Sequence, residues 1–258
     1  MTRHGTSLGV VAALPFEAAC FTRRNIEPGT WRIVTDNLIV HYAGVGAANA
    51  GRAAQSLLRL GVDALVSWGI AGGLAPDLVA GTIVLPEEVI DAGAPDNGGN
   101  WQHPMGRYPV DPDWHGALKD RLAREGIHSH FRGSLVSTQT VQPEPQKKAA
   151  LHHATRAMAV DMESGAIAKA AREAGRPFIV IRSISDTATM TLPTSALGAT
   201  DQYGRSSLSK LSRGLLENPG EITHYPTLIH SLAKAKRGLG RVLELCGNDL
   251  ALPAATTE

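Results

Sequence analysis

Short runs of apolar residues alternate with amphipathic stretches along most of the 258-residue chain. The apolar runs are rich in Val, Ile and Leu, which is typical of strands that are buried on both faces. Strands are expected at 8–14, 31–44, 64–70, 81–90, 132–138, 157–161 and 178–185. Helices are expected at 16–24, 47–60, 112–125, 146–154, 163–174, 206–216 and 225–246. This alternation predicts an α/β fold with a mixed, mostly parallel central sheet flanked by helices.

The spacing of these elements leaves no segment that resembles a linker, so a single domain over residues 1–258 is expected. Residues 204–246 would form a C-terminal helical extension, interrupted at "ENPGE" by Pro219 and Gly220. The segment 91–112 is rich in Gly, Pro, Asn and Asp and is expected to be a long surface loop. Ligands of open α/β sheets bind at the carboxyl ends of strands, so polar residues there are site candidates.

Composition narrows the function classes. Apolar residues make up 43% of the chain and charged residues 19%, which suits a globular protein with a sizeable core. A formal net charge of +1 provides no general attraction for nucleic acid. Cys20 and Cys246 are too far apart in the chain to suggest a disulfide framework, so a cytoplasmic location is expected. The chain lacks an apolar run of the roughly 18 residues that a membrane span needs.

The segment "AGVGAANAG" (43–51) partly matches a dinucleotide-binding fingerprint, because Gly44 and Gly46 open a predicted helix. The third glycine position is Asn49, and Asp63 precedes the next strand instead of ending it. A nicotinamide-dependent dehydrogenase is therefore not favoured. The backbone N–H groups at this helix start could still hold a small anion or a sugar hydroxyl.

A second glycine cluster lies in "SWGIAGGLAPDLVAGTIVLP" (67–86), where Gly69, Gly72 and Gly73 follow a buried strand. Glycines let the backbone turn sharply and approach a ligand closely, although a purely structural turn explains the cluster equally well. The chain has no Walker A lysine, no G-x-S-x-G elbow and no H-E-x-x-H helix. The adjacent His152 and His153 would point apart on a helix, so they do not indicate a metal site. The motifs imply neither a metal nor an organic cofactor.

Two acidic segments are the strongest candidates for chemistry. In "VDMESGAIA" (160–168), Asp161 and Glu163 lie where a strand turns into a helix, and they either offset the helix dipole or hold a substrate. In "FIVIRSISDTA" (178–188), Arg182 falls within a buried strand and needs a partner. Asp186 lies at the end of that strand, where partial burial would keep its carboxyl group protonated as a proton donor. A loop-capping role for Asp186 is the alternative.

These motifs together resemble the superfamily of purine nucleoside phosphorylases and methylthioadenosine/S-adenosylhomocysteine nucleosidases. The resemblance covers most of residues 8–190 and is carried, in order, by "GVVAALPFEA", "AGVGAANA", "GIAGGLAPDLVAGTIVLP" and "VDMESGAIAKAAREAGRPFIVIRSISDTA". It implies an enzyme that breaks the N-glycosidic bond of a purine nucleoside without metal or cofactor. It also implies a small-molecule substrate and a homodimer or higher homo-oligomer.

The resemblance implies roles for individual residues. Asp186 would protonate N7 of the departing purine, and Glu17 would activate the attacking water. Arg182 would lie near that water, and Asp161 would support the site.

The resemblance also assigns the substrate-binding surface. Glu163 would bind the ribose hydroxyls, and Met162 would pack against sugar and base. Ala71 and Gly72 would line the ribose and base pocket. Val141 stands where family members usually have the aromatic residue that stacks on the purine.

The chain departs from the family at the nucleophile. Phosphorolytic members carry an arginine soon after the first strand, whereas "LPFEAA" offers Phe16 and Glu17. A carboxylate repels a phosphate dianion, so hydrolysis is favoured and phosphorolysis is the alternative. Ile70 replaces a serine found in many nucleosidases, which puts part of the water network in doubt. A nucleoside-binding sensor without catalysis would be expected to lack Glu17 or Asp186.

The C-terminal segments "GRSSLSKLSRGLLENPGEI" and "LIHSLAKAKRGLGRVL" resemble a hopanoid-biosynthesis branch of the superfamily, which removes adenine from adenosylhopane. This makes adenosylhopane the leading substrate, with methylthioadenosine or S-adenosylhomocysteine as alternatives. Apolar residues recur near helical spacing, with basic residues between them, at Leu228, Leu232, Leu239, Val242 and Leu243. The helix either packs on its own domain or covers a polycyclic lipid at the pocket mouth while its basic residues approach a membrane.

Overall fold

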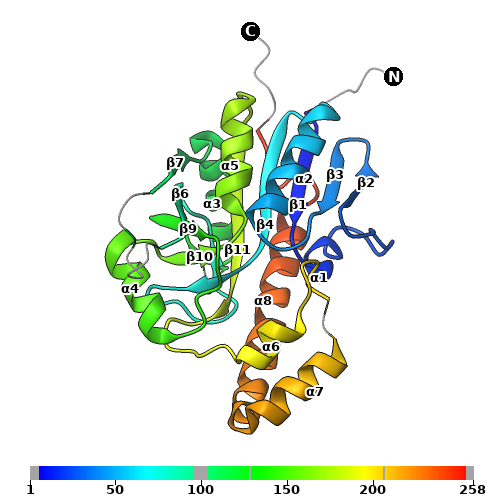
Figure 1. The fold of residues 1–258 in the computed structure, drawn as a ribbon. Coiled ribbons are helices and arrows are strands. Elements are labelled where there is room, and N and C mark those ends of the chain that lie inside the picture. The colour runs from blue at the N-terminus through cyan, green and yellow to red at the C-terminus, as the bar shows by residue number, and fades with distance from the viewer. Residues whose placement is uncertain (1–5, 96–100, 102–103, 128, 206, 254–258) are drawn as a thin grey trace.

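The computed structural model describes residues 6–95, 101, 104–127, 129–205 and 207–253. They form an 11-stranded mixed sheet flanked by helices, as predicted (Figure 1). The strands are β1 (Leu8–Ala12), β2 (Thr30–Thr35), β3 (Leu38–Tyr42), β4 (Ala64–Gly73), β5 (Ile83–Val84), β6 (Glu88–Gly93), β7 (Gly106–Pro109), β8 (Ser129–His130), β9 (Ser134–Thr138), β10 (Ala159–Asp161) and β11 (Phe178–Asp186). The helices are α1 (Pro15–Ala18), α2 (Ala47–Arg59), α3 (Pro112–Arg124), α4 (Pro145–Thr155), α5 (Ser164–Glu173), α6 (Thr194–Ala199), α7 (Leu208–Glu217), the 3₁₀-helix η1 (Pro219–His224) and α8 (Tyr225–Cys246).

The long strand β4 is the centre of the sheet. It pairs in parallel with β1 and with β11, and its last two residues pair antiparallel with β10. Gly72 is the register partner of both Asp186 on β11 and Val160 on β10. This register brings the two acidic segments of the sequence to one place, at the carboxyl ends of the central strands.

Helices cover both faces of the sheet. Successive side chains of a strand point to opposite faces of the sheet. The contacts of two adjacent residues of β11 therefore show which helix covers each face. Arg182 contacts Ser164 at the start of α5, whereas Ser183 faces Gly238 of α8. The α2 and α5 helices pack together on the first face, and α3 packs with α8. Strand β11 is therefore buried on both sides, which explains the continuous apolar run Phe178–Ile181 with which it begins.

Three predicted elements need correction. The expected strand 81–90 is split into β5 and β6 around Pro86, because proline cannot donate a ladder hydrogen bond. The expected loop 91–112 contains β7, which pairs antiparallel with β6. Part of that loop, residues 96–100 and 102–103, lies outside the described residues. The predicted helix 16–24 is only the single turn α1.

The C-terminal region contains the predicted helical hairpin, with η1 at its bend, preceded by the short helix α6 that the sequence did not indicate. Leu239 and Val242 are fully buried in the main core. Of the two alternatives for this helix, these two side chains therefore fit packing on their own domain and not contact with a lipid. Among the described residues, no helix is long and apolar enough to cross a membrane.

Close packing of α8 on β11 predicts opposite effects for two glycines of this helix. A Cβ at Gly238 would lie 2.6 Å from Ser183 Oγ and 2.9 Å from the Gly81 carbonyl oxygen, whereas Gly240 has open space around it. Gly238→Ala should lower the free energy of unfolding by about 1–3 kcal/mol through overpacking. Gly240→Ala should raise it by about 0.5–1 kcal/mol through helix propensity. Urea unfolding measures both, and a Gly238→Ala midpoint equal to the parental one would contradict this packing.

Candidate active site

A cavity of about 310 Å³ opens at the carboxyl ends of the central strands. We call it the pocket. Its walls come from the ends of β1, β4, β10 and β11, from the 138–142 segment after β9, and from residues 192–201 around α6. The expected site residues that line it are Glu17, Ala71, Gly72, Val141, Met162, Glu163 and Asp186. Arg182 is not among the described lining residues and lies behind the wall.

Glu17 is held at the pocket by the turn that follows β1. Pro15 occupies the first helical position of α1, where its missing N–H is not needed. The Glu17 carboxylate is 2% exposed and accepts hydrogen bonds from the backbone N–H groups of Ala13 and Leu14, each at 2.9 Å, and of Ile70 at 2.8 Å. Burial raises its pKa, an effect that the charge of Arg182 and these N–H groups oppose. Glu17 is thus a fixed carboxylate with increased basicity.

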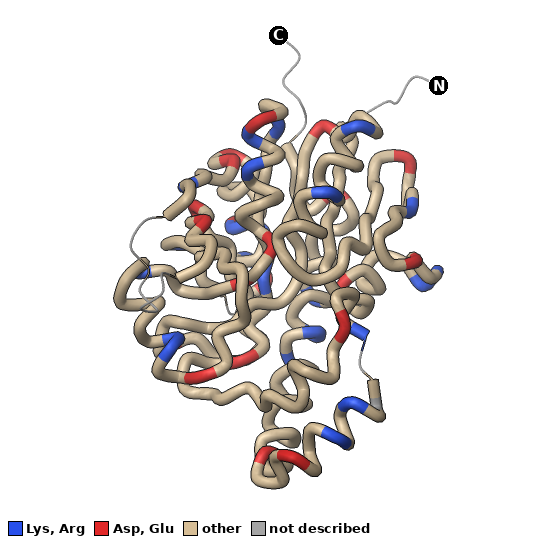
Figure 2. The backbone as a smooth tube through the Cα atoms, in the orientation of Figure 1, with Lys and Arg blue, Asp and Glu red and all other residues tan. Residues whose placement is uncertain are grey.

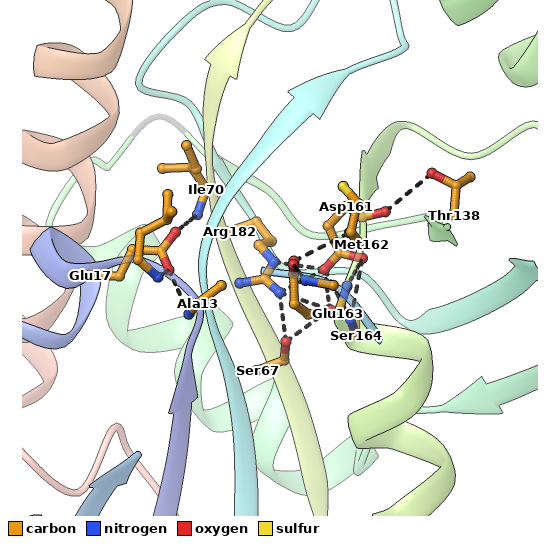
Figure 3. Close-up of polar contacts among 12 residues, drawn as sticks. Ala13, Glu17, Ser67, Ile70, Thr138, Asp161, Met162, Glu163, Ser164 and Arg182 are labelled. Carbon is orange, nitrogen blue, oxygen red and sulfur yellow. Dashed lines mark hydrogen bonds and ion pairs between the residues drawn. The ribbon is translucent and has the colours of Figure 1, made fainter. Parts of the chain in front are cut away.

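The buried guanidinium of Arg182 forms an ion pair with Asp161. Its Nε and Nη2 donate to Asp161 Oδ2 at 2.9 and 2.6 Å, and Nη2 also donates to Ser67 Oγ at 2.7 Å (Figure 3). Asp161 also accepts a hydrogen bond from the hydroxyl of Ser164, the first residue of α5. The carboxylate of Asp161 is therefore occupied by supporting contacts.

The guanidinium of Arg182 also lies close to Glu17. A Cβ at Gly69 would be 2.7 Å from both Arg182 Nη1 and Glu17 Cδ, so these two groups crowd the same space beside β4. Figure 3 shows Arg182 between Glu17 on one side and Asp161 on the other. Only glycine at position 69 leaves room for this arrangement. Arg182 thus acts on the pocket through the carboxylates that it neighbours.

Glu163 stands at the start of α5 and is 8% exposed. Its Oε1 accepts a hydrogen bond of 2.7 Å from the N–H of Gly46, the residue before α2. Gly46 has a φ of +96°, a conformation that favours glycine. The "AGVGAANAG" segment thus directs a helix N-terminus at a carboxylate of this chain. Burial, followed by the charge of Asp161, raises the pKa of Glu163 to about 7, against the opposing effect of Arg182.

Asp186 has a partner that the sequence analysis missed. Lys148 of α4 is 0% exposed, and its Nζ lies 2.5 Å from Asp186 Oδ2. The other carboxylate oxygen accepts a hydrogen bond of 2.6 Å from Ser185 Oγ. The sequence contained no signal for this contact, because Lys147 and Lys148 are adjacent and only the fold buries one of them.

The remaining walls of the pocket are mainly apolar, and the described lining contains no aromatic residue. Val141 lines the pocket and is 38% exposed. Leu192 and Leu197 come from the segment around α6, and Leu14 and Ile70 face the pocket near Glu17. A flat base would thus contact aliphatic side chains and not a stacked ring.

The ionisable residues among the described lining of the pocket are all acidic. Five acidic residues line it, and the described lining contains no Lys or Arg. The acids are Glu17, Asp161, Glu163, Asp186 and Asp201. In the described part of the chain, no group of three His, Cys, Asp or Glu residues is placed to hold a metal ion. An acid-lined, otherwise apolar pocket at the strand ends of an α/β sheet can favour a substrate that develops positive charge.

The phosphorylase superfamily model matches residues 7–217, so the chain belongs to that superfamily. Among curated relatives, the 5′-methylthioadenosine/S-adenosylhomocysteine nucleosidase of Mycobacterium tuberculosis is 29% identical over 219 residues, covering 70% of this chain and 86% of the relative. The nucleosidase of the same name from Shewanella piezotolerans is 30% identical over 175 residues, covering 65% of this chain and 76% of the relative.

Solved structures share the fold at lower sequence identity. Futalosine hydrolase of Helicobacter pylori superimposes with a TM-score of 0.68 at 17% identity, over 93% of this chain and 96% of that one. The 5′-methylthioadenosine/S-adenosylhomocysteine nucleosidase of the same organism, bound to butyl-thio-DADMe-Immucillin-A, gives a TM-score of 0.66 at 18% identity, over 93% and 98%. The predicted superfamily and fold class are both confirmed.

The raised pKa of Glu163 predicts a pH-dependent gain of stability in Glu163→Gln. Because the folded-state pKa of about 7 exceeds the ordinary 4.5, this group favours folding below pH 4.5, and that contribution is lost as the pH rises to about 7. Above pH 7 the free energy of unfolding of the variant should therefore exceed that of the parent by about 1–3 kcal/mol, so the variant should unfold at a higher temperature. Near pH 5 the difference should shrink. The matched control is Glu173→Gln, at the exposed end of α5.

Thermal unfolding between pH 5 and 8.5 measures this difference. A gap between Glu163→Gln and the parent that stays constant over this range would show that Glu163 is not a carboxylate strained by burial.

Proposed function

We propose that this chain cleaves the N-glycosidic bond of an adenine nucleoside by hydrolysis. The observation that carries the proposal is the acid-lined pocket, whose described lining includes five acidic residues and no Lys or Arg. A phosphate dianion would be repelled there, whereas water would not. The nucleosidase relatives and the futalosine hydrolase fold support hydrolysis of such a bond.

The attack on the sugar is assigned to water and Glu17. The Glu17 carboxylate is fixed by three backbone N–H groups, and burial raises its pKa, so it is suited to take a proton from water. As the C1′–N9 bond breaks, the ribose gains positive charge. Glu163, with its carboxylate oriented by Gly46, is assigned to the ribose hydroxyls. The negative wall of the pocket stabilises the developing oxocarbenium charge.

Protonation of the departing base is assigned to Asp186, and contact with the base is assigned to the neighbouring pocket wall. Protonation at N7 lets adenine leave as a neutral molecule, a contribution of about 10²–10⁴-fold for general acid catalysis. Asp186 lines the pocket at the end of β11. Gly72 permits its approach, since a Cβ there would lie only 3.1 Å from Asp186 Oδ2. Met162 and Val141 would contact base and sugar through apolar surface.

Adenosylhopane is the leading substrate. With the inner pocket occupied by base and ribose, a polycyclic substituent on the ribose 5′ carbon would extend past Leu192 and Leu197 toward the α6–α7 region. Exposed apolar side chains occur in the adjoining helices: Leu216 is 84% exposed, Ile222 is 61% exposed and Ile229 is 63% exposed. Basic residues also lie on α7 and α8 (Figure 2). This combination suits a lipid-linked nucleoside presented at a membrane surface.

Adenine release should not depend on phosphate. Incubation of adenosine or methylthioadenosine with the protein, with and without phosphate, should give the same rate and an unphosphorylated sugar in both cases, ribose from the first and 5-methylthioribose from the second. Glu17→Gln should lower this rate by about 10²-fold or more, because the amide cannot take up the proton of water. Product analysis by chromatography with mass detection distinguishes ribose from ribose 1-phosphate.

Asp186→Asn is the companion variant and should also lose most turnover, because its amide has no carboxyl proton to offer N7. A phosphate-dependent rate that yields ribose 1-phosphate would replace the hydrolytic mechanism with phosphorolysis. Adenine release by Asp186→Asn at the parental rate would remove Asp186 from the mechanism.

The lipid assignment makes a separate prediction. The double variant Leu216→Ser with Ile222→Ser should lower kcat/KM for a lipid-substituted adenine nucleoside by about tenfold or more, through the loss of apolar contact. The rate on methylthioadenosine should stay unchanged. The control is Ile33→Ser, which removes a side chain of similar exposure (54%) from the β2 edge of the sheet. Equal losses on both nucleosides would assign the two side chains to folding alone.

A further inference from the structure

The side chain of Lys148 is enclosed in the protein wall beside the base end of the pocket. It comes from α4 and reaches the segment that follows β11. Its Nζ donates to Asp186 Oδ2 at 2.5 Å and to the carbonyl oxygens of Thr187 at 2.8 Å and Met190 at 3.0 Å. Three donors meet three acceptors, so the ammonium is completely satisfied without water.

Burial of an ammonium and a carboxylate together is not explained by stability. Removing both charges from water is unfavourable, and an apolar pair of similar volume is often equally stable or more stable. Asp186 is 4% exposed and Lys148 is 0% exposed, so this pair carries the full desolvation penalty. Lys147, one position earlier, remains on the surface and pairs with Glu144. The chain thus places one of two adjacent lysines against the group that faces the base.

We propose that Lys148 is a positioning residue that holds the proton for the leaving purine and delivers it through Asp186. The inference rests on the proposed N-glycosidic cleavage and adds a residue to it. The acid of the reaction is then the Lys148–Asp186 pair and not an isolated carboxyl group. This assignment accounts for an acid role of Asp186 although the Lys148 ammonium lies 2.5 Å from its carboxylate oxygen.

The proton transfers balance in the following way. At rest, the shared proton is on Lys148 Nζ and Asp186 is a carboxylate. As the C1′–N9 bond breaks, its electron pair goes to the purine and N7 becomes strongly basic. One proton moves from Nζ to Oδ2 and on to N7, which leaves Lys148 as a neutral amine, Asp186 as a carboxylate and adenine as a neutral product. Water adds to C1′ and gives its proton to Glu17. Exchange with solvent after product release returns one proton to Lys148 and removes one from Glu17.

The test replaces Lys148 with residues that cannot donate the proton, and it compares substrates whose bases do and do not need protonation to leave. Lys148→Met keeps an unbranched side chain of similar size, and Lys148→Gln keeps a donor for the carbonyl oxygens, but neither can supply this proton. Each is assayed on adenosine, whose base must be protonated to leave, and on 7-methyladenosine, whose base already carries the charge. We expect kcat on adenosine to fall about 10²-fold or more, with less than a tenfold loss on 7-methyladenosine. Lys147→Met is the matched control and should leave both rates unchanged.

Two further measurements exclude a purely structural role. Thermal unfolding reports whether each variant keeps the fold, and adenine binding reports whether it keeps the base pocket. The rates that test the proposal are those of a Lys148 variant that keeps both. If the parent does not accept a 7-methyl group, 2-fluoroadenosine replaces it, since its base is a better leaving group, and the loss on it should be smaller than on adenosine.

Equal losses on both nucleosides, or no loss on adenosine, would overturn the proton role of Lys148. A parent that releases no adenine from any of these nucleosides would instead reject the proposed function, and the two failures are therefore distinct.

Discussion

The buried guanidinium of Arg182 is the contact on which the site depends. Its donors join β11 to Ser67 of β4 and to Asp161 at the end of β10. Asp161 in turn binds Ser164 at the start of α5, so one cation connects three strands and a helix. An unpaired guanidinium at this depth would be strongly unfavourable, which fixes the relative position of these elements. The positive charge of Arg182 also acts on the pKa values of Glu17 and Glu163, which it lowers against the larger effect of burial.

The distribution of charge around the pocket follows one rule. Negative groups face the cavity, and the positive groups that stabilise them stand behind the wall: Arg182 behind Asp161, and Lys148 behind Asp186. Such an arrangement keeps several carboxylates close together in a buried place at a tolerable cost. It also keeps Lys and Arg out of the described lining of the cavity, which suits a sugar that becomes positively charged and offers no cation to hold an anionic nucleophile.

The pocket also requires that the backbone come close to the buried side chains that surround it. Gly69 leaves the space occupied by Glu17 and Arg182, and Gly72 leaves the space occupied by Asp186. Gly46 adopts a positive φ and directs its N–H at Glu163. The glycine segments therefore contribute to function by the volume that they leave empty and by the N–H groups that they expose. None of them needs to bind a nucleotide phosphate for its conformation to be explained.

The fold class followed from hydrophobic periodicity, because strands buried on both faces and amphipathic helices leave distinct patterns in a sequence. The ends of helices α2 and α8 were predicted to within one residue for this reason. Short edge pieces such as β7 escaped prediction, since their pairing with β6 is supplied by a distant segment. The main site carboxylates could also be found, because each lies next to a strand end.

What the sequence could not determine is which partner each buried charge would take. It indicated that Arg182 needed an acid but did not distinguish Asp161 from Glu17. The sequence did not distinguish Lys147 from Lys148. The packing of α4 against the segment after β11 exposes the first and encloses the second. The helical spacing of Leu239 likewise fitted both a lipid and a core. These choices depend on contacts between residues far apart in the chain, whose geometry exists only once the tertiary structure has formed.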